Sequence, residues 1–240
     1  MNRNILIYGG SGGIGSALAR RLASAGAKVH LAGRNQDSLA ALAAEIDAGY
    51  TVGDVTEPDF FPRVMDAAGE RIDGLVYAVG TINLRGFQRL EAEDYLRDFQ
   101  VNALGAALAV KDALKALKKS ESASVVLFSS VAALNGFSFH ASMGAAKGAV
   151  SGLTRSLAAE LAPKIRVNAI APSLVETPLT GKMLANEKTV DALAAFHPLK
   201  RLGTAEDIAA VAAMLLSPES GWMTGQIISV DGGRSTLAGG

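Results

Sequence analysis

Cysteine is absent from the 240 residues of this chain, which excludes disulfides, thiol nucleophiles and cysteine-based metal sites. Neither sign of charge is in excess, because 23 Lys and Arg balance 23 Asp and Glu, and this argues against a nucleic-acid or acidic-membrane surface. The three histidines are scattered without a cluster of carboxylates, so we predict no metal site. No apolar run approaches the roughly 20 residues of a membrane span, and the first residues do not follow the pattern of a secretory signal. We therefore expect a cytoplasmic protein whose partner is a small molecule, with no nucleic acid and no membrane involved.

Strand-like and helix-like segments alternate along the chain, and aromatic residues make up only 5% of it, which suits close packing of helices on a sheet. Short apolar runs predict strands at residues 5–8, 28–32, 50–54, 74–78, 124–128, 165–170 and 226–230. Helical patterns follow from Ala17 onward and at residues 37–46, 58–68, 91–117, 142–161 and 205–216. This alternation implies right-handed crossovers between parallel strands. The sequence therefore predicts an α/β fold, a doubly wound parallel sheet (Rossmann fold) of seven strands with helices on both faces, in which residues 1–240 form a single domain.

The first predicted strand leads directly into a glycine-rich turn that opens a helix. Gly9, Gly13 and Gly15 give the pattern G-x-x-x-G-x-G, which differs from the G-x-G-x-x-G of the common dinucleotide fingerprint. Glycines let the backbone approach a pyrophosphate closely, and the free N–H groups and dipole of a helix N-terminus favour an anion. A plain tight turn is the alternative. The strand before the turn and the helix after it favour a phosphate site.

The turn and a series of later landmarks, all in register, resemble the short-chain dehydrogenase/reductase family over essentially the whole chain. The later landmarks are Asp54 after the third predicted strand, Asn102 in the helix at 91–117, Ser130 after the fifth strand, Lys147 in the helix at 142–161, the segment 166–172, Thr177, and the segments 201–203 and 231–233. The resemblance implies a nicotinamide cofactor and an oxidoreductase that acts on a carbonyl or alcohol of a small organic molecule. It also implies a homodimer or homotetramer in which the helices at 91–117 and 142–161 pair.

The resemblance further implies roles for individual residues. Ser130, Lys147 and Asn102 match the family's catalytic serine, lysine and asparagine. Asp54 stands where the family binds adenine, and Thr177 stands where it contacts a phosphate. The cofactor-binding residues implied in this way are Gly9, Ser11, Gly12, Gly13, Ile14, Gly15, Asp54, Val55, Ala78, Gly80, Lys147, Pro172, Val175 and Thr177.

Met143 is the most serious departure from the family pattern. The family's Tyr-x-x-x-Lys motif places a tyrosine four residues before the lysine, and the residue four before Lys147 is Met143. Ser130 lies 13 positions before Met143, which is the family's usual spacing from serine to tyrosine. Smaller departures are Tyr-Ala-Val-Gly at 77–80 and Pro-Ser at 172–173, where the family has Asn-Asn-Ala-Gly and Pro-Gly. A thioether carries no exchangeable proton, so Met143 cannot serve as the acid or base.

His140 is the candidate to replace the missing tyrosine as proton donor. It lies three residues before Met143, in the loop expected just ahead of the helix, and histidine titrates in the range that acid–base catalysis uses. The alternative is a histidine that caps the helix or packs on the surface. Ser142 is predicted to be the N-cap of the helix at 142–161, because serine is a favoured capping residue.

Arg34 determines the predicted form of the cofactor. About twenty residues after the glycine turn, NAD enzymes carry an acid that holds the ribose 2′-hydroxyl. Here the second predicted strand ends in Gly33-Arg34-Asn35 without a carboxylate, and the guanidinium of Arg34 suits a 2′-phosphate. A surface arginine is the alternative. We therefore predict NADP(H) as the cofactor.

Three functions are compatible with these residues. The first is an NADP(H)-dependent oxidoreductase with an atypical active site, favoured because Ser130, Lys147 and Asn102 are retained together. The second is a catalytically impaired dinucleotide-binding protein, a sensor or scaffold, and the third is an enzyme that performs elimination or isomerisation on the same fold. Residues 172–198 are predicted to form a mobile lid, with an ordinary surface loop as the alternative. Together with Phe137 and Phe139 they are expected to line an apolar substrate.

Overall fold

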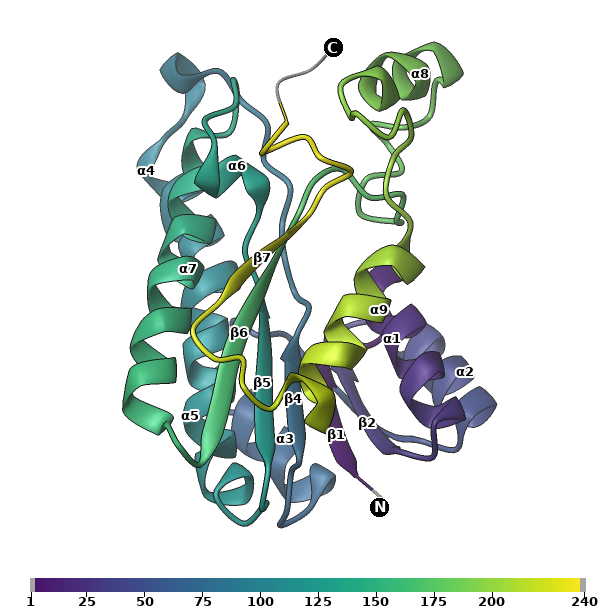
Figure 1. Ribbon diagram of the computed structural model, residues 1–240, viewed down its shortest axis with the longest axis vertical. Coiled ribbons are helices and arrows are strands. Elements are labelled where there is room, and N and C mark those ends of the chain that lie inside the picture. Colours follow the sequence, from purple (N-terminus) through teal and green to yellow (C-terminus); the bar gives the residue numbers. More distant parts are fainter. Residues whose placement is uncertain (1–2, 238–240) are drawn as a thin grey trace.

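A seven-stranded parallel sheet forms the centre of the computed structural model, which describes residues 3–237 (Figure 1). Its strands are β1 (Asn4–Tyr8), β2 (Lys28–Gly33), β3 (Gly49–Val52), β4 (Gly74–Tyr77), β5 (Ala123–Phe128), β6 (Ile165–Pro172) and β7 (Ile227–Val230). The order across the sheet is β3-β2-β1-β4-β5-β6-β7, so the direction of winding reverses between β1 and β4. This confirms the predicted doubly wound α/β fold. The largest boundary differences are at β3 and β6, which were expected at 50–54 and 165–170.

Helices cover both faces of the sheet, as the alternation of segments predicted (Figure 1). α1 (Gly13–Ser24), α2 (Gln36–Ile46) and α9 (Ala205–Leu216) pack on one face, and α3 (Phe60–Ala68), α5 (Gly105–Leu117) and α7 (Ala141–Leu161) pack on the other. β1 is hydrophobic from Ile5 to Tyr8 because these side chains enter both cores. Ile5 and Ile7 lie under α1 and α9, whereas Leu6 and Tyr8 lie under α3 and α5.

The predicted helix at 91–117 is interrupted in its middle. α4 (Ala92–Phe99) and α5 are separated by a π-helical turn at Gln100–Leu104. The Tyr77 hydroxyl donates to the carbonyl of Val101 at 2.6 Å, and it fills the space that a side chain on Gly105 would need. The wide turn directs the buried Asn102 towards Thr81, just beyond β4. The expectation of one regular helix is therefore wrong at this point.

Ser142 is not the N-cap of α7, contrary to the sequence prediction. The N-cap is His140, because Phe139 adopts a left-handed conformation with φ of 66° and turns the chain into the helix earlier than expected. Ser142 lies inside the first turn, where it is 1% exposed and its hydroxyl has no partner among residues 3–237. The turn ahead of α7 therefore places Ser142 inside the helix, although serine favours the capping position.

Several short helices were not predicted from the sequence. They are α6 (Val131–Leu134), α8 (Glu187–Ala195) and the 3-10 turns Phe87–Arg89 and Pro218–Ser220. α8 lies within the predicted lid, and Asn186 caps it by accepting from the N–H of Lys188. Figure 1 places α8 at the same end of the molecule as α6, beyond the carboxyl ends of the strands. In the part of the chain that the structure describes, no helix is long and apolar enough to cross a membrane.

Candidate active site

In the turn between β1 and α1, Gly9, Gly13 and Gly15 leave no room for side chains at their positions. Gly9 has a φ of 77°, and a Cβ on Gly15 would overlap the carbonyl oxygen of Gly9. A Cβ on Gly13 would lie 2.7 Å from the side chain of Thr177, so the segment after β6 lies directly over the turn. α1 begins at Gly13, and no side chain caps its first N–H groups. The turn therefore has the geometry of an anion cradle, with free N–H groups and space for a group such as a phosphate.

One open cleft runs along the carboxyl ends of the strands. It is lined by most of the predicted cofactor-binding residues, namely Gly9, Ser11, Gly12, Gly13, Ile14, Gly15, Arg34, Asp54, Val55, Ala78, Gly80 and Thr177. Three others lie outside its lining: Lys147 is buried, Pro172 ends β6, and Val175 is buried beyond that strand. The cleft also contains Thr81, which the sequence did not single out. The structure thus brings the turn, the ends of β2 to β4 and the segment after β6 together.

Arg34 and Asp54 face each other across the part of the cleft beyond β2 and β3. Arg34 Nη1 lies 3.6 Å from Asp54 Oδ2, and the arginine side chain is 76% exposed. Burial raises the pKa of Asp54, but hydrogen bonds from the backbone and hydroxyl of Thr56 and the charge of Arg34 outweigh it and lower this pKa. Asp54 is therefore a carboxylate, and the loose, exposed guanidinium of Arg34 remains accessible to an anion.

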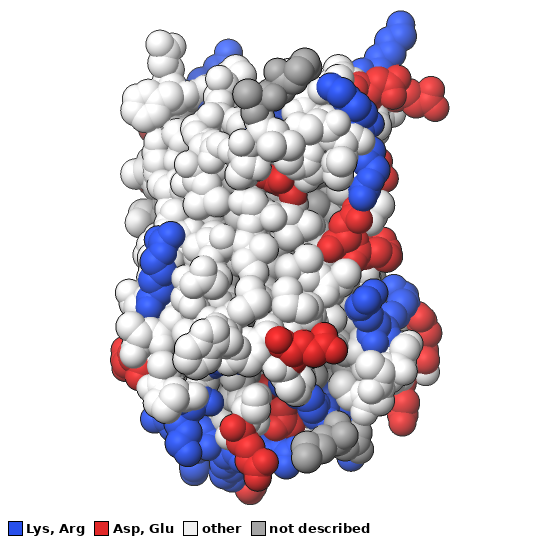
Figure 2. All heavy atoms as spheres, viewed as in Figure 1, with Lys and Arg blue, Asp and Glu red and all other residues white. Residues whose placement is uncertain are grey.

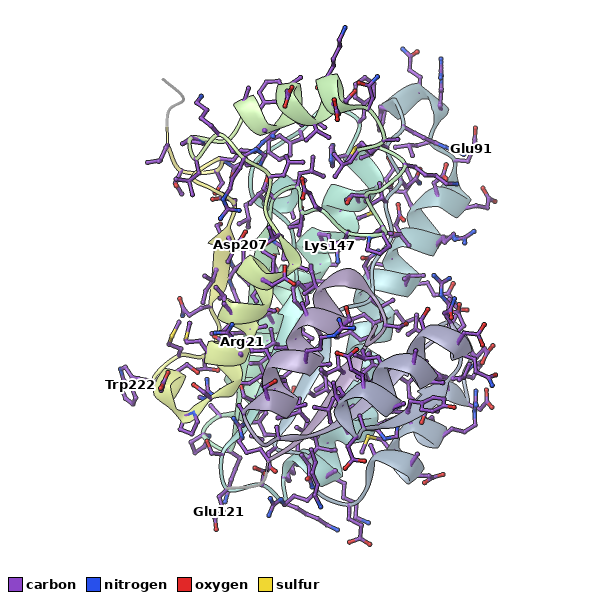
Figure 3. The ribbon with its side chains drawn as sticks, turned by 90° about the vertical axis from the view of Figure 1, so that its right-hand side faces the viewer. Arg21, Glu91, Glu121, Lys147, Asp207 and Trp222 are labelled. Atoms are coloured by element: carbon purple, nitrogen blue, oxygen red, sulfur yellow. The ribbon has the colours of Figure 1, made fainter. Side chains whose placement is uncertain are left out.

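Lys147 extends from α7 into the interior and lies near the middle of the molecule (Figure 3). Only 8% of the residue is exposed, and its ammonium donates to the carbonyl of Phe128 at 2.9 Å. Burial lowers the pKa of Lys147 to about 8, and the negative charge of Asp98 opposes this shift in part. The ammonium is therefore charged at neutral pH but close to the range in which it loses its proton.

Lys147 should give the free energy of unfolding a measurable pH dependence. The pKa is near 8 in the folded state and 10.5 in the reference state, so the folded protein loses the proton first as the pH rises. Between these values the unfolded chain binds more protons, and stability should increase with pH by roughly 3 kcal/mol. Denaturant unfolding on either side of this window would measure the increase. Lys147→Met should lack it, and an equal increase in the variant would contradict the assignment.

Asn102 is fixed within the π-helical turn by its amide nitrogen. Its Nδ2 donates to the carbonyl of Asp98 at 2.8 Å and to Thr81 Oγ1 at 2.9 Å. Its Oδ1 is buried and has no partner among the described residues. Asn102 Oδ1 and Lys147 Nζ lie 3.3 Å and 3.5 Å from the position that a Cβ on Gly80 would take. Asn102 Oδ1, an acceptor, and the Lys147 ammonium, a donor, thus both face the backbone of Gly80. The unpartnered Oδ1 is the kind of buried acceptor that a ligand or a water satisfies.

Ser130 and Met143 are the two predicted landmarks that precede Lys147 in the sequence. Ser130 follows β5 and caps α6, and its Oγ accepts from the N–H of Ala132 at 3.1 Å, which leaves the hydroxyl proton for another acceptor. Met143 is 9% exposed and lies one helical turn before Lys147, at the position where the sequence pattern leads us to expect a tyrosine. Its sulfur is 3.3 Å from Thr81 Oγ1. The side chain fills this position but supplies no proton.

His140 stands at the N-terminus of α7 with its ring 5.8 Å from that of Phe137, measured between centroids. Ring Nδ1 lies 2.7 Å from the carbonyl oxygen of Ser138. A carbonyl only accepts, so Nδ1 carries the hydrogen, and Nε2 of the neutral ring is unprotonated. Neutral His140 can therefore accept a proton at Nε2 and can donate one from it only as the imidazolium. Within residues 3–237, no hydrogen bond joins it to Ser130 or Lys147.

Asp98 and Thr81 are the site residues that the sequence analysis missed. Asp98 is 2% exposed and accepts from Thr81 Oγ1 at 2.7 Å. Two signals were available, because Asp98 lies four residues before Asn102, a spacing that puts both on one helical face, and Thr81 directly follows Gly80. A carboxylate in a polar helix is usually solvated, and only the packing against Thr81 distinguishes this one.

The sequence is similar to known proteins over almost its full length. A family model described as enoyl-(acyl carrier protein) reductase matches residues 9–235. A tropinone reductase homolog from Arabidopsis thaliana is 35% identical over 241 residues, covering 96% of this chain and 91% of the relative. A short-chain type dehydrogenase/reductase from Mycobacterium ulcerans has a TM-score of 0.93 at 32% identity, covering 100% of this chain and 92% of the other. The chain belongs to the short-chain dehydrogenase/reductase family, whose members are oxidoreductases that use nicotinamide dinucleotides.

Two further similarities concern activity and cofactor. A protein from Xanthobacter autotrophicus named inactive 2-(S)-hydroxypropyl-CoM dehydrogenase 2 is 36% identical over 230 residues, covering 92% of this chain and 100% of the relative. A solved structure described as ElxO with NADP bound has a TM-score of 0.90 at 28% identity, covering 99% of this chain and 100% of that chain. Relatives of this chain thus include a protein named inactive and a protein that binds NADP.

Proposed function

We propose that this protein is an NADP(H)-dependent oxidoreductase that acts on a carbonyl or alcohol group of a small organic substrate, with Met143 in place of the usual tyrosine. The observation that carries the proposal is the arrangement of a single cleft. An anion cradle that begins at Gly9 lies at one part of it, and Lys147 and Asn102 Oδ1 lie just behind its wall at Gly80. Such a cleft suits a ligand with a pyrophosphate in one part and hydrogen-bonding hydroxyls in another.

The residues along the cleft fit the parts of NADP(H). The glycine-rich turn and Thr177 would hold the pyrophosphate, Asp54 the adenine, Arg34 the 2′-phosphate, and Lys147 the ribose next to the nicotinamide. When bound, the nicotinamide supplies or accepts a hydride. Ser130 would donate its hydroxyl proton in a hydrogen bond to the substrate oxygen, and the charge of Lys147 would stabilise the negative charge that develops there. His140, which could donate only as the imidazolium, is the first of two candidates for the proton donor and is the one expected from the sequence.

Arg34→Ala should weaken NADPH binding selectively. A hydrogen bond to a charged group contributes about 1.5–3 kcal/mol, or roughly 10- to 100-fold in affinity, and the exposure of Arg34 favours the lower end. NADH lacks the 2′-phosphate, so its affinity should be unchanged. Fluorescence titration of both cofactors would measure this, with Arg20→Ala, an exposed arginine paired with Glu45, as the control. Equal affinities of the wild type for NADPH and NADH would contradict the proposed preference.

A measurement of substrate turnover distinguishes this proposal from its main alternative, which is a catalytically impaired dinucleotide-binding protein. The alternative is supported by Met143 and by the Xanthobacter relative that is named inactive. NADPH consumption with a panel of ketones, quinones and aldehydes, measured beside NADPH binding, distinguishes the two. The proposal expects both binding and turnover, whereas binding without turnover of any compound would favour a sensor or scaffold.

A homodimer or homotetramer is the proposed assembly, in which α4, α5 and α7 meet their copies. Leu96 is 68% exposed and Phe99 is 48% exposed on α4. A Cβ on Gly148 or Gly152 of α7 would meet nothing within 4 Å. Figure 2 shows few charged side chains over the middle of the face that carries α7, β6 and β7. These features suit close contact between copies.

Light scattering at micromolar concentration should therefore find a dimer or tetramer. Gly148→Trp should shift it towards monomer, because the ring would block close helix contact while the space around Gly148 leaves the fold intact. A wild type that is only monomeric would contradict the assembly.

Cytoplasmic localisation stays part of the proposal.

A further inference from the structure

The Thr81 hydroxyl connects the cleft to a buried carboxylate. Thr81 is partly exposed and lines the cleft next to Gly80. Behind it, Asp98 is 2% exposed, and its Oδ1 lies 2.7 Å from Thr81 Oγ1. Asn83 Nδ2 approaches the other carboxylate oxygen at 3.4 Å, and the positive charge of Lys147 interacts with Asp98 across the interior. A buried carboxylate is costly unless charges and hydrogen bonds compensate it, so this one is built into the site.

The directions of the hydrogen bonds at Thr81 follow from its neighbours. Asn102 Nδ2 is a donor, so Thr81 Oγ1 accepts from it at 2.9 Å. The single hydroxyl proton goes to Asp98 Oδ1 rather than to the sulfur of Met143 at 3.3 Å, because a carboxylate is the stronger acceptor. A hydroxyl oxygen has two lone pairs, and Asn102 uses one. The second lone pair of Thr81 is available for a proton from the cleft.

We propose that Thr81 and Asp98 form the proton-transfer pair that acts in place of the missing tyrosine; this rests on the proposed oxidoreductase function. In alcohol oxidation, the substrate hydroxyl proton passes to Thr81 Oγ1 while the Thr81 proton passes to Asp98. The carbinol carbon gives its hydride to the oxidised nicotinamide. One alcohol and one oxidised cofactor thus yield one carbonyl compound, one reduced cofactor and a protonated Asp98, which returns its proton to solvent. Carbonyl reduction runs the same transfers in reverse.

The position of the pair supports this role. Met143, at the place of the family's tyrosine, touches Thr81 through its sulfur, so the hydroxyl lies beside the position from which the phenol is missing. Asn102 holds Thr81, and Lys147 faces the same glycine as Asn102. Thr81 is therefore the residue that would touch substrate, and Asp98 acts through it.

The first test uses the cofactor-free protein and needs no turnover. The carboxyl carbon of Asp98 is followed by ¹³C NMR at neutral pH in the wild type, Thr81→Val and Thr81→Ser. Loss of the hydroxyl removes a hydrogen bond from the carboxylate, so Thr81→Val should shift the resonance of this carbon, whereas Thr81→Ser should keep it near its wild-type position. Thr154→Val, which removes a buried threonine hydroxyl in α7, is the control. An Asp98 resonance that Thr81→Val leaves unmoved would overturn the pairing.

The second test is kinetic. Thr81→Val and Asp98→Asn should lower kcat by about 10²–10⁴-fold and alter its pH profile, with NADPH affinity unchanged and Thr81→Ser largely active. Asp73→Asn, a buried carboxylate near the other end of β4, is the control for loss of a buried charge. If Thr81→Val and Asp98→Asn kept the wild-type kcat and pH profile, this inference would be overturned while the proposed function would stand. A loss of turnover in His140→Ala would then identify His140 as the proton donor. A wild type that binds NADPH but turns over nothing would overturn the proposed function, and this inference with it.

Discussion

Met143→Tyr is expected to raise the turnover of a simple carbonyl compound, by about 10²–10⁴-fold in the Thr81→Val background, the usual contribution of a general acid, and by less where the Thr81–Asp98 pair is intact. The substitution places a phenol one helical turn before Lys147, whose buried ammonium lowers the pKa of a nearby phenol. The larger ring must fit where Met143 is 9% exposed and touches Thr81, and overpacking costs about 1–3 kcal/mol of stability. Steady-state kinetics at saturating NADPH, with thermal unfolding of the same samples, would measure both effects.

Met143→Phe is the matched control, because it adds the ring without the hydroxyl. It should show the loss of stability without the gain in turnover. In the Thr81→Val background, Met143→Tyr should restore activity, since the phenol would make the Thr81 hydroxyl dispensable. Equal turnover in Met143→Tyr and Met143→Phe, with NADPH still bound, would mean that more than a phenol separates this site from a working reductase. That result would favour the binding-protein alternative.

Gly15→Ala is expected to abolish tight NADPH binding and to destabilise the fold. The new Cβ would overlap the carbonyl oxygen of Gly9, and all the atoms nearest to it are backbone atoms of Gly9 and Gly10, so no flexible side chain can move aside. The expected loss of stability is about 1–3 kcal/mol, and each lost contact to a phosphate lowers the affinity by roughly 10- to 100-fold. Isothermal titration with NADPH and denaturant unfolding would measure the two losses.

Gly152→Ala makes the same chemical change within α7, where a Cβ meets nothing within 4 Å. It should leave NADPH binding unchanged, because Gly152 is not among the residues that line the cleft. If Gly15→Ala bound NADPH as the wild type does, the turn would not be the phosphate cradle.

The fold was predictable because one physical signal repeats along the chain. The central strands β1, β4 and β5 are buried on both faces and therefore form nearly continuous apolar runs. The edge strands β3 and β7 are more exposed and were recognised as short runs between helical segments. The π-helical turn was not predictable. It depends on the Tyr77 hydroxyl reaching Val101 beside Gly105, and these residues come from separate elements.

The candidate site was predictable where its residues follow strand ends and not where it depends on packing. Gly13 and Thr177 were named from the sequence, and both follow strands that end at the same edge of the sheet. Their direct contact was not predictable, because β4 and β5 separate β1 from β6 and the segment after β6 must reach back over them. Asp98 was overlooked because nothing in a polar helix marks one carboxylate as buried. Ser142 was misplaced because the left-handed turn at Phe139, not the preference of serine, decides where α7 begins.

Transfer of deuterium from NADPH labelled at the reacting C4 position to a mixed panel of ketones, quinones and aldehydes tests the central claim most directly. The account predicts that mass spectrometry of the products finds a deuterium on the carbon that was the carbonyl carbon. Lys147→Met should lack this product. An absence of labelled alcohol from the wild type, under conditions in which titration shows NADPH to be bound, would contradict the proposal that this protein is an oxidoreductase.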